Sequence, residues 1–195
     1  MKLPSAFYQE DDVVKVAVDL LGKILVTNFD DGITSGIIVE TEAYSWRERG
    51  CHAYRGKMTK RNAAMFQHGG VSYVYLCYGM HELFNVVTSK EGIGEAVLVR
   101  ALQPEDGQQI MLARCGASKL KRITAGPGKL TKALGITRQQ NLTDLSGDEI
   151  WIEDRSLVVR PSQVLASPRI GLNFGGPDAL LPWRFTIKGN EWVSK

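Results

Sequence analysis

Two stretches that pair β-rich runs across a short turn limit this chain to a fold built on antiparallel strands. Residues 23–26 and 34–43 flank the letters DDG, which favour a tight turn between two strands. Residues 71–87 read VSYVYLCYGMHELFNVV and form two similar arms around YGMH. A third apolar run covers residues 96–102. We therefore predict two hairpins followed by a further strand.

Helical spacing occurs in short segments outside these runs. The segment 11–22 begins with an acid that can act as a cap and ends with a glycine. Its apolar residues recur at helical spacing and are Val14, Ala17, Val18 and Leu21. We also predict helices over 59–66, over 105–115 and within AGPGKLTKALG, which closes at a glycine.

The last third of the sequence predicts further strands at 150–153, 156–160 and 184–188. Neither an internal repeat nor a tract typical of a linker is present. We therefore predict a single α+β domain over residues 1–195, with a curved, mostly antiparallel sheet, surrounding helices and a protruding hairpin at 71–87. At 195 residues and 44% hydrophobic content, such a domain can bury a sizeable core.

The positive charge of the chain is concentrated in one region. The formal net charge is only +3, but no acidic residue occurs from Gly107 to Thr143. The basic residues of this stretch are Arg114, Lys119, Lys121, Arg122, Lys129, Lys132 and Arg138. Such a stretch is either an ordinary solvated face or a surface that contacts a phosphate backbone.

Cysteine usage and the first residues indicate a compartment. Cys51, Cys77 and Cys115 are odd in number and form no zinc-type spacing, so we expect reduced thiols. The start MKLPSAFYQEDD lacks the apolar run of a signal peptide, and no stretch approaches the ~18 apolar residues of a membrane span. We expect a cytoplasmic protein without membrane contact, associated with the nucleoid if the source is bacterial.

The strand GIIVETEAYSW aims three reactive side chains in one direction. Because side chains alternate along a strand, Glu40, Glu42 and Tyr44 are expected on one face and Thr41 and Ala43 on the other. Two carboxylates and a phenol on one face make this strand the first candidate site.

Other motifs leave alternatives open. AGPGKL lacks the Ser or Thr that a Walker loop needs after Gly-Lys, although the helix start beside Lys129 could receive a backbone phosphate. His52, His68 and His81 share no metal-ligand spacing, and no metal is predicted. Tyr78, at the turn of the second hairpin, either packs back on its own hairpin or projects as a wedge that unstacks a duplex.

Long, ordered motifs along nearly the whole chain resemble one known family. These motifs are GIIVETEAY, CHAYRG, TKRNAAMF, GGVSYVYLCYGMHELFNVV, AVLVRALQP, AGPGKLTKALGI, RIGL and WRFTIKGNEWVS. Together they resemble the alkyladenine (3-methyladenine) DNA glycosylases, which are monofunctional base-excision enzymes. The N-terminal extension of the mammalian members has no counterpart in this sequence.

The resemblance implies roles for residues that would form a base pocket. Glu42 matches the general base, and Tyr44 matches the aromatic residue that stacks on the extruded base. His52 would lie at the edge of the base, and Tyr75 would form the opposite wall of the aromatic slot. Asn85 matches a residue that disfavours the exocyclic amine of undamaged guanine.

The resemblance also implies contacts with water and with DNA. Arg100 matches an arginine that helps to hold the attacking water. Tyr78 matches the wedge that fills the gap left by the flipped nucleotide, and Met80 lies beside it. Lys129 and Arg138 match positions that contact phosphates.

The resemblance assigns no exact role to three further parts of the sequence. Glu40 has no chemical role in the family pattern, so we expect a structural one. A backbone carbonyl near RIGL would help to hold the water, and it belongs either to Ile170 or to Leu172. The segment SWRERGC, which precedes His52, is one residue shorter than in the mammalian pattern, so pocket preferences are expected to differ.

The function implied is excision of damaged purines from double-stranded DNA by a monomer that needs no cofactor. The base would be flipped out, and an activated water would hydrolyse its N-glycosidic bond. The expected lesions are 3-methyladenine, 7-methylguanine, hypoxanthine and ethenoadenine. Two alternatives remain: a DNA-binding module without catalysis, and a metal-dependent nucleic-acid hydrolase that uses Glu40, Glu42 and His52.

Overall fold

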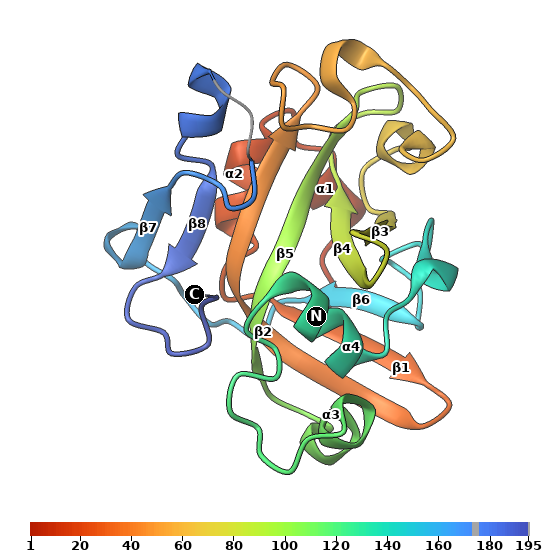
Figure 1. The fold of residues 1–195 in the computed structure, drawn as a ribbon, viewed down its shortest axis with the longest axis vertical. Coiled ribbons are helices and arrows are strands. Elements are labelled where there is room, and N and C mark those ends of the chain that lie inside the picture. Colours follow the sequence, from red (N-terminus) through yellow and green to blue (C-terminus); the bar gives the residue numbers. More distant parts are fainter. Residues whose placement is uncertain (173–175, 195) are drawn as a thin grey trace.

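The long strand β2 (Gly32–Ser45) lies at the centre of an eight-stranded sheet (Figure 1). The structure is a computed structural model that describes residues 1–172 and 176–194. One edge of β2 pairs with β5 (Glu95–Pro104), and the other pairs with β1 (Ile24–Phe29) and then with β8 (Arg184–Ile187). These pairs are antiparallel, and the α+β class is confirmed.

The remaining strands extend the sheet in both directions. β3 (Ser72–Cys77) and β4 (His81–Val87) form the second predicted hairpin, which joins the sheet through β5. β6 (Ile150–Glu153) pairs with β1 at the opposite edge. β7 (Val164–Ser167), which the sequence analysis did not predict, pairs with β8. The hairpin therefore ends the sheet on one side, and its turn is free to project.

Helix α2 (Val13–Asp19) packs against β2 and β5. It begins after Asp12, whose carboxylate accepts two amides of the first turn. Val14 and Val18, which belong to the apolar pattern that predicted this helix, are only partly buried, because the helix turns a neighbouring face toward the sheet. The buried residues of α2 are Val13, Val16 and Ala17.

Helices α3 (Gln108–Cys115) and α4 (Pro127–Leu134) confirm two further predictions. α4 packs against β4 and β5, and its buried residues are Leu130, Thr131, Ala133 and Leu134. It ends at Gly135, which adopts a left-handed conformation with φ of 72°. A short first helix, α1 (Ser5–Tyr8), was not predicted. Single 3₁₀ turns cover Tyr54–Gly56, Ala63–Phe66, Arg138–Gln140, Pro161–Gln163 and Pro177–Leu180.

The helix predicted over 59–66 is wrong, because only the 3₁₀ turn Ala63–Phe66 forms there. The side chain of Asn62 organises the segment instead. Its oxygen accepts from the amide and hydroxyl of Thr59, and its nitrogen donates to the carbonyls of His52 and Lys57. Such side-chain contacts compete with helical hydrogen bonds.

The strand predicted at 156–160 is also wrong. Ser156 adopts a left-handed conformation with φ of 63°, and the Asp154 carboxylate accepts its amide at 2.6 Å. This local turn directs the chain away from β6 before it can pair. The β-prone residues that follow are therefore left without a partner strand.

A second, smaller core cluster lies under the β3–β4 hairpin. Its buried members are Cys51, Ala53, Ala64, Met65, Phe66, Val71, Tyr73, Val87 and Ala96. Tyr44, Trp46 and Tyr75 pack against this cluster and remain partly exposed. The cluster thus supports aromatic side chains from β2 and β3 that face a common opening.

Candidate active site

Irregular pairing between β2 and β5 sets the direction of the two glutamates. Val39 of β2 and Arg100 of β5 have no partner residue in this pairing, and the two resulting register shifts come directly before and directly after Glu40. Bulges of this kind re-aim side chains. Thr41 points toward α2, where its hydroxyl donates to a carbonyl at 2.7 Å. Glu40 and Glu42 therefore share the opposite face with Arg100.

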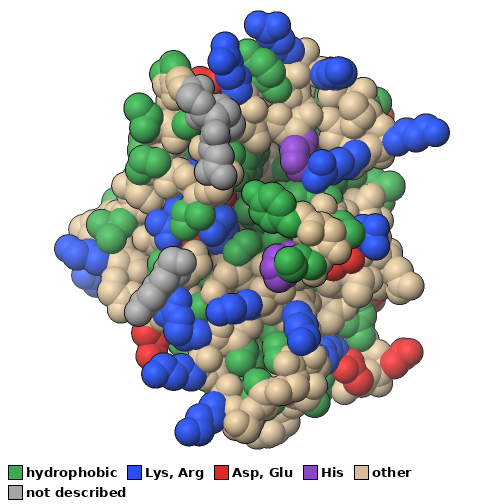
Figure 2. Space-filling model, viewed as in Figure 1, with side chains coloured by type: hydrophobic (Ala, Val, Ile, Leu, Met, Phe, Trp, Pro, Cys, Tyr) green, Lys and Arg blue, Asp and Glu red, His purple; other side chains and the backbone are tan. Residues whose placement is uncertain are grey.

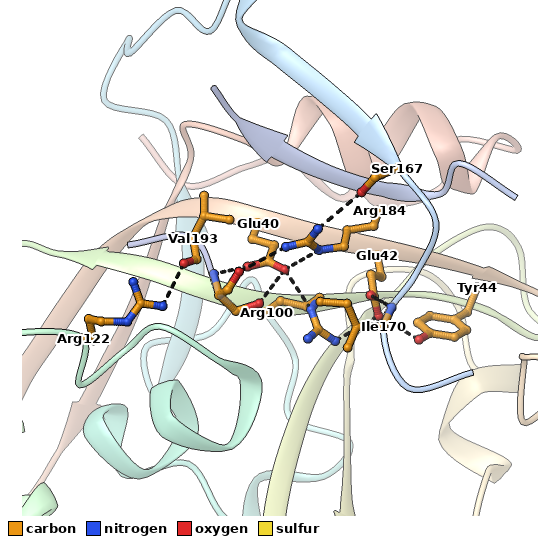
Figure 3. A network of polar contacts seen from close by, with 10 residues as sticks. Glu40, Glu42, Tyr44, Arg100, Arg122, Ser167, Ile170, Arg184 and Val193 are labelled. Atoms are coloured by element: carbon orange, nitrogen blue, oxygen red, sulfur yellow. Dashed lines mark hydrogen bonds and ion pairs between the residues drawn. The ribbon is translucent and has the colours of Figure 1, made fainter. Parts of the chain in front are cut away.

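Arg100 joins the two carboxylates (Figure 3). Its Nε donates to Glu40 at 2.9 Å, and its Nη1 donates to Glu42 at 3.2 Å. All three side chains are buried. Two buried anions that share one cation would be costly without further hydrogen bonds, so each carboxylate should have additional donors.

Glu42 receives those donors from two other segments of the chain. The Ile170 amide donates to Oε1 at 2.7 Å, and the Tyr44 hydroxyl donates to Oε2 at 2.8 Å. With Arg100, three donors face a group that can accept about four hydrogen bonds when ionised. Among the described residues, Oε1 accepts only from the Ile170 amide, so the remaining acceptor position of the Glu42 carboxylate is on Oε1.

Glu40 is held more completely than Glu42. Arg184 Nε donates to it at 2.7 Å, and Ser194 donates both its amide, at 2.6 Å, and its hydroxyl, at 2.8 Å. Burial acts to raise the pKa of Glu40, but the hydrogen bonds from Ser194 and Arg184 and the charge of Arg100 outweigh it and lower the pKa. Glu40 is thus a fixed, ionised anchor.

Tyr44 lies between Glu42 and a second buried arginine. Burial, together with the charge of Glu42, raises the pKa of the phenol well above its usual value, so the hydroxyl keeps its proton and donates to Glu42. The guanidinium of Arg169 lies over the Tyr44 ring, 4.7 Å from its centroid. A ligand could therefore stack only on the other face of the ring.

A cavity of about 650 Å³ opens beside these residues. This volume lies within the range of small-molecule pockets. The residues assigned to the site by the sequence analysis that line it number seven, namely Tyr44, His52, Tyr75, Tyr78, Asn85, Arg100 and Lys129. Glu42 lies directly behind this wall, because its three donors, Tyr44, Arg100 and Ile170, all line the cavity.

His52, Tyr73 and Tyr75 form an aromatic group on one wall. His52 Nδ1 and the Tyr73 hydroxyl are hydrogen-bonded at 2.9 Å, and the His52 ring meets that of Tyr75 edge-on at 4.7 Å. His52 keeps an exposed surface at the mouth, but burial of its packed side and the charge of Arg61 lower its pKa to about 4. The imidazole is therefore neutral near pH 7. The sequence analysis gave Tyr73 no part in the pocket.

Asn85 is buried on β4, where it lies opposite Tyr73 of β3. Its Nδ2 donates to the Tyr73 carbonyl at 3.0 Å. The side chain is thereby held against the lining of the cavity.

The tip of the β3–β4 hairpin projects over the mouth of the cavity. Tyr78 and Gly79 have φ of 50° and 72°, and the Met80 amide donates to the Cys77 carbonyl, which describes a type I′ turn. Tyr78 is 81% exposed and Met80 is 67% exposed. The alternative in which Tyr78 packs back on its hairpin is wrong.

The two predicted phosphate-binding residues differ in their surroundings. Lys129, in the first turn of α4, is exposed and lines the cavity. Arg138 is exposed but pairs with Glu82 at 3.2 Å. Figure 2 shows a hollow near the middle of this face, with histidine side chains beside it and Lys and Arg side chains around it.

The acid-free stretch 107–143 does not present all of its cations to one surface. Arg114 binds Asp31 and is mostly buried. Arg122 donates to the carbonyls of Glu191 and Val193. These two arginines hold the fold together, so the predicted DNA-facing surface depends on the remaining basic residues.

Arg169 is a buried residue of the RIGL motif to which sequence reasoning assigned no role. Its Nη1 donates to the Ala43 carbonyl and, with Nη2, forms a two-point contact with Glu48 at 2.7 Å. It thereby anchors the RIGL segment to β2. The neighbouring Ile170 amide reaches Glu42 from this anchored position.

The three residues of the metal-hydrolase alternative do not form a metal site. Glu40 and Glu42 share Arg100, whereas His52 contacts Tyr73. Within residues 1–172 and 176–194, no three His, Cys, Asp or Glu side chains gather as a metal would require. That the reaction needs no metal stays a prediction.

Comparison with known families identifies the family of the chain. A family model described as methylpurine-DNA glycosylase (MPG) matches residues 6–191. The chain belongs to this family. Its relatives include a protein of Chlamydia abortus, 44% identical over 95% of this chain and 97% of its own, and one of Carboxydothermus hydrogenoformans, 45% identical over the full length of both. A protein of Methanocella arvoryzae is 45% identical over 99% of this chain and 96% of its own.

All three relatives carry the provisional name 3-methyladenine DNA glycosylase. As a member of the methylpurine-DNA glycosylase family, the protein is a hydrolytic DNA glycosylase of base excision repair. Its macromolecular substrate is damaged DNA. None of the helices in the described part of the chain has the length and apolar character needed to cross a bilayer.

Proposed function

We propose that this glycosylase flips alkylated or deaminated purines out of duplex DNA and hydrolyses their N-glycosidic bond with water activated by Glu42. The proposed lesions are 3-methyladenine, 7-methylguanine, hypoxanthine and ethenoadenine. The observation that carries the proposal is the position of Glu42, a fully buried carboxylate directly behind the wall of an aromatic cavity. We further propose that residues 1–195 act as one domain and as a monomer.

The fixed geometry around Glu42 supports a general base. Its free acceptor position on Oε1 would receive the water, while Arg100 and Tyr44 keep the carboxylate from rotating. A carboxylate at this place would take a proton from the water and stabilise the positive charge that develops on the sugar. Because water is the proposed nucleophile, no covalent enzyme intermediate and no strand nicking are expected.

The aromatic walls support selection of damaged bases. The free face of Tyr44 and the ring of Tyr75 both line the cavity. Purines alkylated at N3 or N7 are cationic and attract aromatic faces by about 0.5 to 2 kcal/mol. Alkylation also weakens the glycosidic bond, whereas a neutral base such as hypoxanthine would need a proton as it leaves.

The projecting hairpin supports base flipping. Extrusion of a base costs roughly a few kcal/mol of stacking and pairing, and less at damaged pairs. Tyr78, with Met80 beside it, is exposed on a turn whose conformation is fixed by two paired strands. An aromatic side chain inserted into the duplex would offset part of that cost.

An excision assay with a matched pair of variants tests this function. Duplexes that carry one hypoxanthine or one alkylated purine are incubated with the protein, and alkali then cleaves at abasic sites. Glu42→Gln keeps the size of the side chain but removes its charge, so excision should fall by orders of magnitude while lesion binding persists. Glu91→Gln, at an exposed position, is the control.

The same assay separates the alternatives. Near-normal excision by Glu42→Gln would remove the proposed base. Loss of wild-type excision on addition of a chelator would favour a metal-dependent hydrolase. Absence of excision across a broad panel of lesions, with binding retained, would favour a module that only binds DNA.

A further inference from the structure

The C-terminal segment 190–194 reaches the layer of side chains directly behind the active site. Ser194 donates two hydrogen bonds to Glu40, one from its amide at 2.6 Å and one from its hydroxyl at 2.8 Å. Glu40 in turn accepts from Arg100 Nε, while Arg100 Nη1 reaches Glu42. A continuous chain of contacts thus links segment 190–194 to Glu42.

The segment is held by contacts along its length. Arg122 donates to the carbonyls of Glu191 and Val193 at 3.1 and 3.2 Å. The Asn190 side chain donates to that of Gln103 at 2.9 Å. These contacts attach the segment to β5 and to the loop before α4. The position of Ser194 is therefore set by the fold and does not depend on Glu40 alone.

The two bonds from Ser194 determine how Arg100 is shared. With them, Glu40 is satisfied by Ser194, Arg184 and one nitrogen of Arg100. Without them, a fully buried carboxylate would keep only its two arginine partners. A buried carboxylate with too few hydrogen bonds attracts a neighbouring cation strongly. Glu40 would then form a two-point contact with Arg100. That contact would draw Arg100 Nη1 away from Glu42.

We propose that segment 190–194 is part of the catalytic apparatus, and that Ser194 is a positioning residue which holds Arg100 against Glu42 through Glu40. The inference rests on the proposed role of Glu42 as the base. The family match ends at residue 191, so Ser194 lies just beyond it. In this role Ser194 influences the orientation of the Glu42 carboxylate and does not contact the substrate.

Two independent variants test this positioning role. Ser194→Ala removes the hydroxyl donor, and Arg122→Gln removes the clamp on the segment. Both should lower the single-turnover excision rate by roughly tenfold or more, because displacement of a catalytic group by ~1 Å can cost about a hundredfold. Affinity for a lesion duplex should stay within about twofold, since neither residue lines the cavity. Ser194→Thr, which keeps the hydroxyl, should restore most of the rate, and Ser162→Ala is an exposed control.

A double-mutant cycle with Glu40→Gln gives a readout that a general loss of stability would not produce. If Ser194 acts through Glu40, Ser194→Ala should have little further effect on the rate in the Glu40→Gln background. Unchanged excision rates in both Ser194→Ala and Arg122→Gln would overturn the proposal. So would losses of rate that follow the loss of thermal stability and are additive between Ser194→Ala and Glu40→Gln. Glu42→Gln is measured in parallel. If Glu42→Gln excises normally, the proposed function fails. If Glu42→Gln loses excision while Ser194→Ala and Arg122→Gln keep the wild-type rate, only the positioning role of segment 190–194 is rejected.

Discussion

The guanidinium of Arg169 lies over the ring of Tyr44, 4.7 Å from its centroid, and is itself bound at two points by Glu48. The positive charge on the covered face of Tyr44 is therefore balanced by a carboxylate. Tyr44 is held flat between the arginine and the cavity, so its free face is ordered before a base arrives. Order of this kind lowers the entropy cost of binding.

Arg169→Gln should destabilise the fold and weaken lesion binding. Removal of the cation leaves Glu48 buried without its partner, which typically costs about 3 to 5 kcal/mol of unfolding free energy. Arg169→Lys keeps the charge but not the planar fork, so its loss should be smaller. Urea unfolding and lesion affinity are the measurements. An unfolding free energy equal to that of the wild type in Arg169→Gln would show that this ion pair contributes little.

Tyr78→Ala should reduce retention of the flipped base. Without the aromatic side chain, the extruded nucleotide can return to the stack. A fluorescent base analogue opposite or beside the lesion reports extrusion, and Tyr78→Phe, which keeps the ring, is the control. If extrusion were as complete with alanine as with tyrosine, the hairpin would have no wedge function.

Glu82→Gln should raise the affinity for undamaged duplex. Glu82 pairs with Arg138 at 3.2 Å and so competes with a phosphate for that side chain. Its removal frees the Arg138 side chain to contact a phosphate. Affinity measured at several salt concentrations should show a steeper dependence than in the wild type. Combining Glu82→Gln with Arg138→Ala should abolish the gain, and a gain that persists would place its origin elsewhere.

Lys129→Ala should flatten the salt dependence of DNA binding. Each lost phosphate contact reduces the slope of log affinity against log salt by about one unit. Lys129 is exposed at the cavity and has no ion-pair partner in the described part of the chain, so its contact should be stronger than that of Arg138. Lys188→Ala, at an exposed position directly after β8, is the matched control. Equal slopes for wild type and Lys129→Ala would show that the first turn of α4 does not face DNA.

The pKa of His52 predicts a loss of stability in mild acid. Burial and Arg61 lower this pKa from 6.5 to about 4, so the unfolded state takes up a proton first as pH falls. The contribution of His52 to stability is complete above pH 6.5 and declines between 6.5 and about 4. His52→Gln should remove this part of the pH dependence. A nuclear magnetic resonance titration of His52 with a midpoint near 6.5 would contradict the shift.

Local sequence patterns predicted the strands and helices that form by contacts with near neighbours. The DDG hairpin, the YGMH hairpin and α4 all follow from turn residues and spacing. The prediction at 156–160 was wrong because strand propensity does not reveal whether a partner strand is available. The one at 59–66 was wrong because a single side chain, Asn62, replaced the helical bonds.

The site could be predicted only where a residue belongs to a recognisable motif. Strand alternation placed Glu40 and Glu42 on one face, and the family resemblance drew attention to Arg100. The partners that fix this arrangement have no local pattern, because Ile170 and Ser194 lie 128 and 154 residues along the chain from the carboxylates they bind. Only the folded chain brings them together.

This separation along the chain has a consequence for synthesis. During translation, β2 and β5 emerge early and can pair, but Glu40 meets its last donor only when residue 194 has left the ribosome. Chains emerge at roughly 5 to 20 residues per second, so an incomplete centre persists for seconds on each nascent protein. A chain released early would carry β2, β5 and the β3–β4 hairpin, yet lack the contact between Ser194 and Glu40.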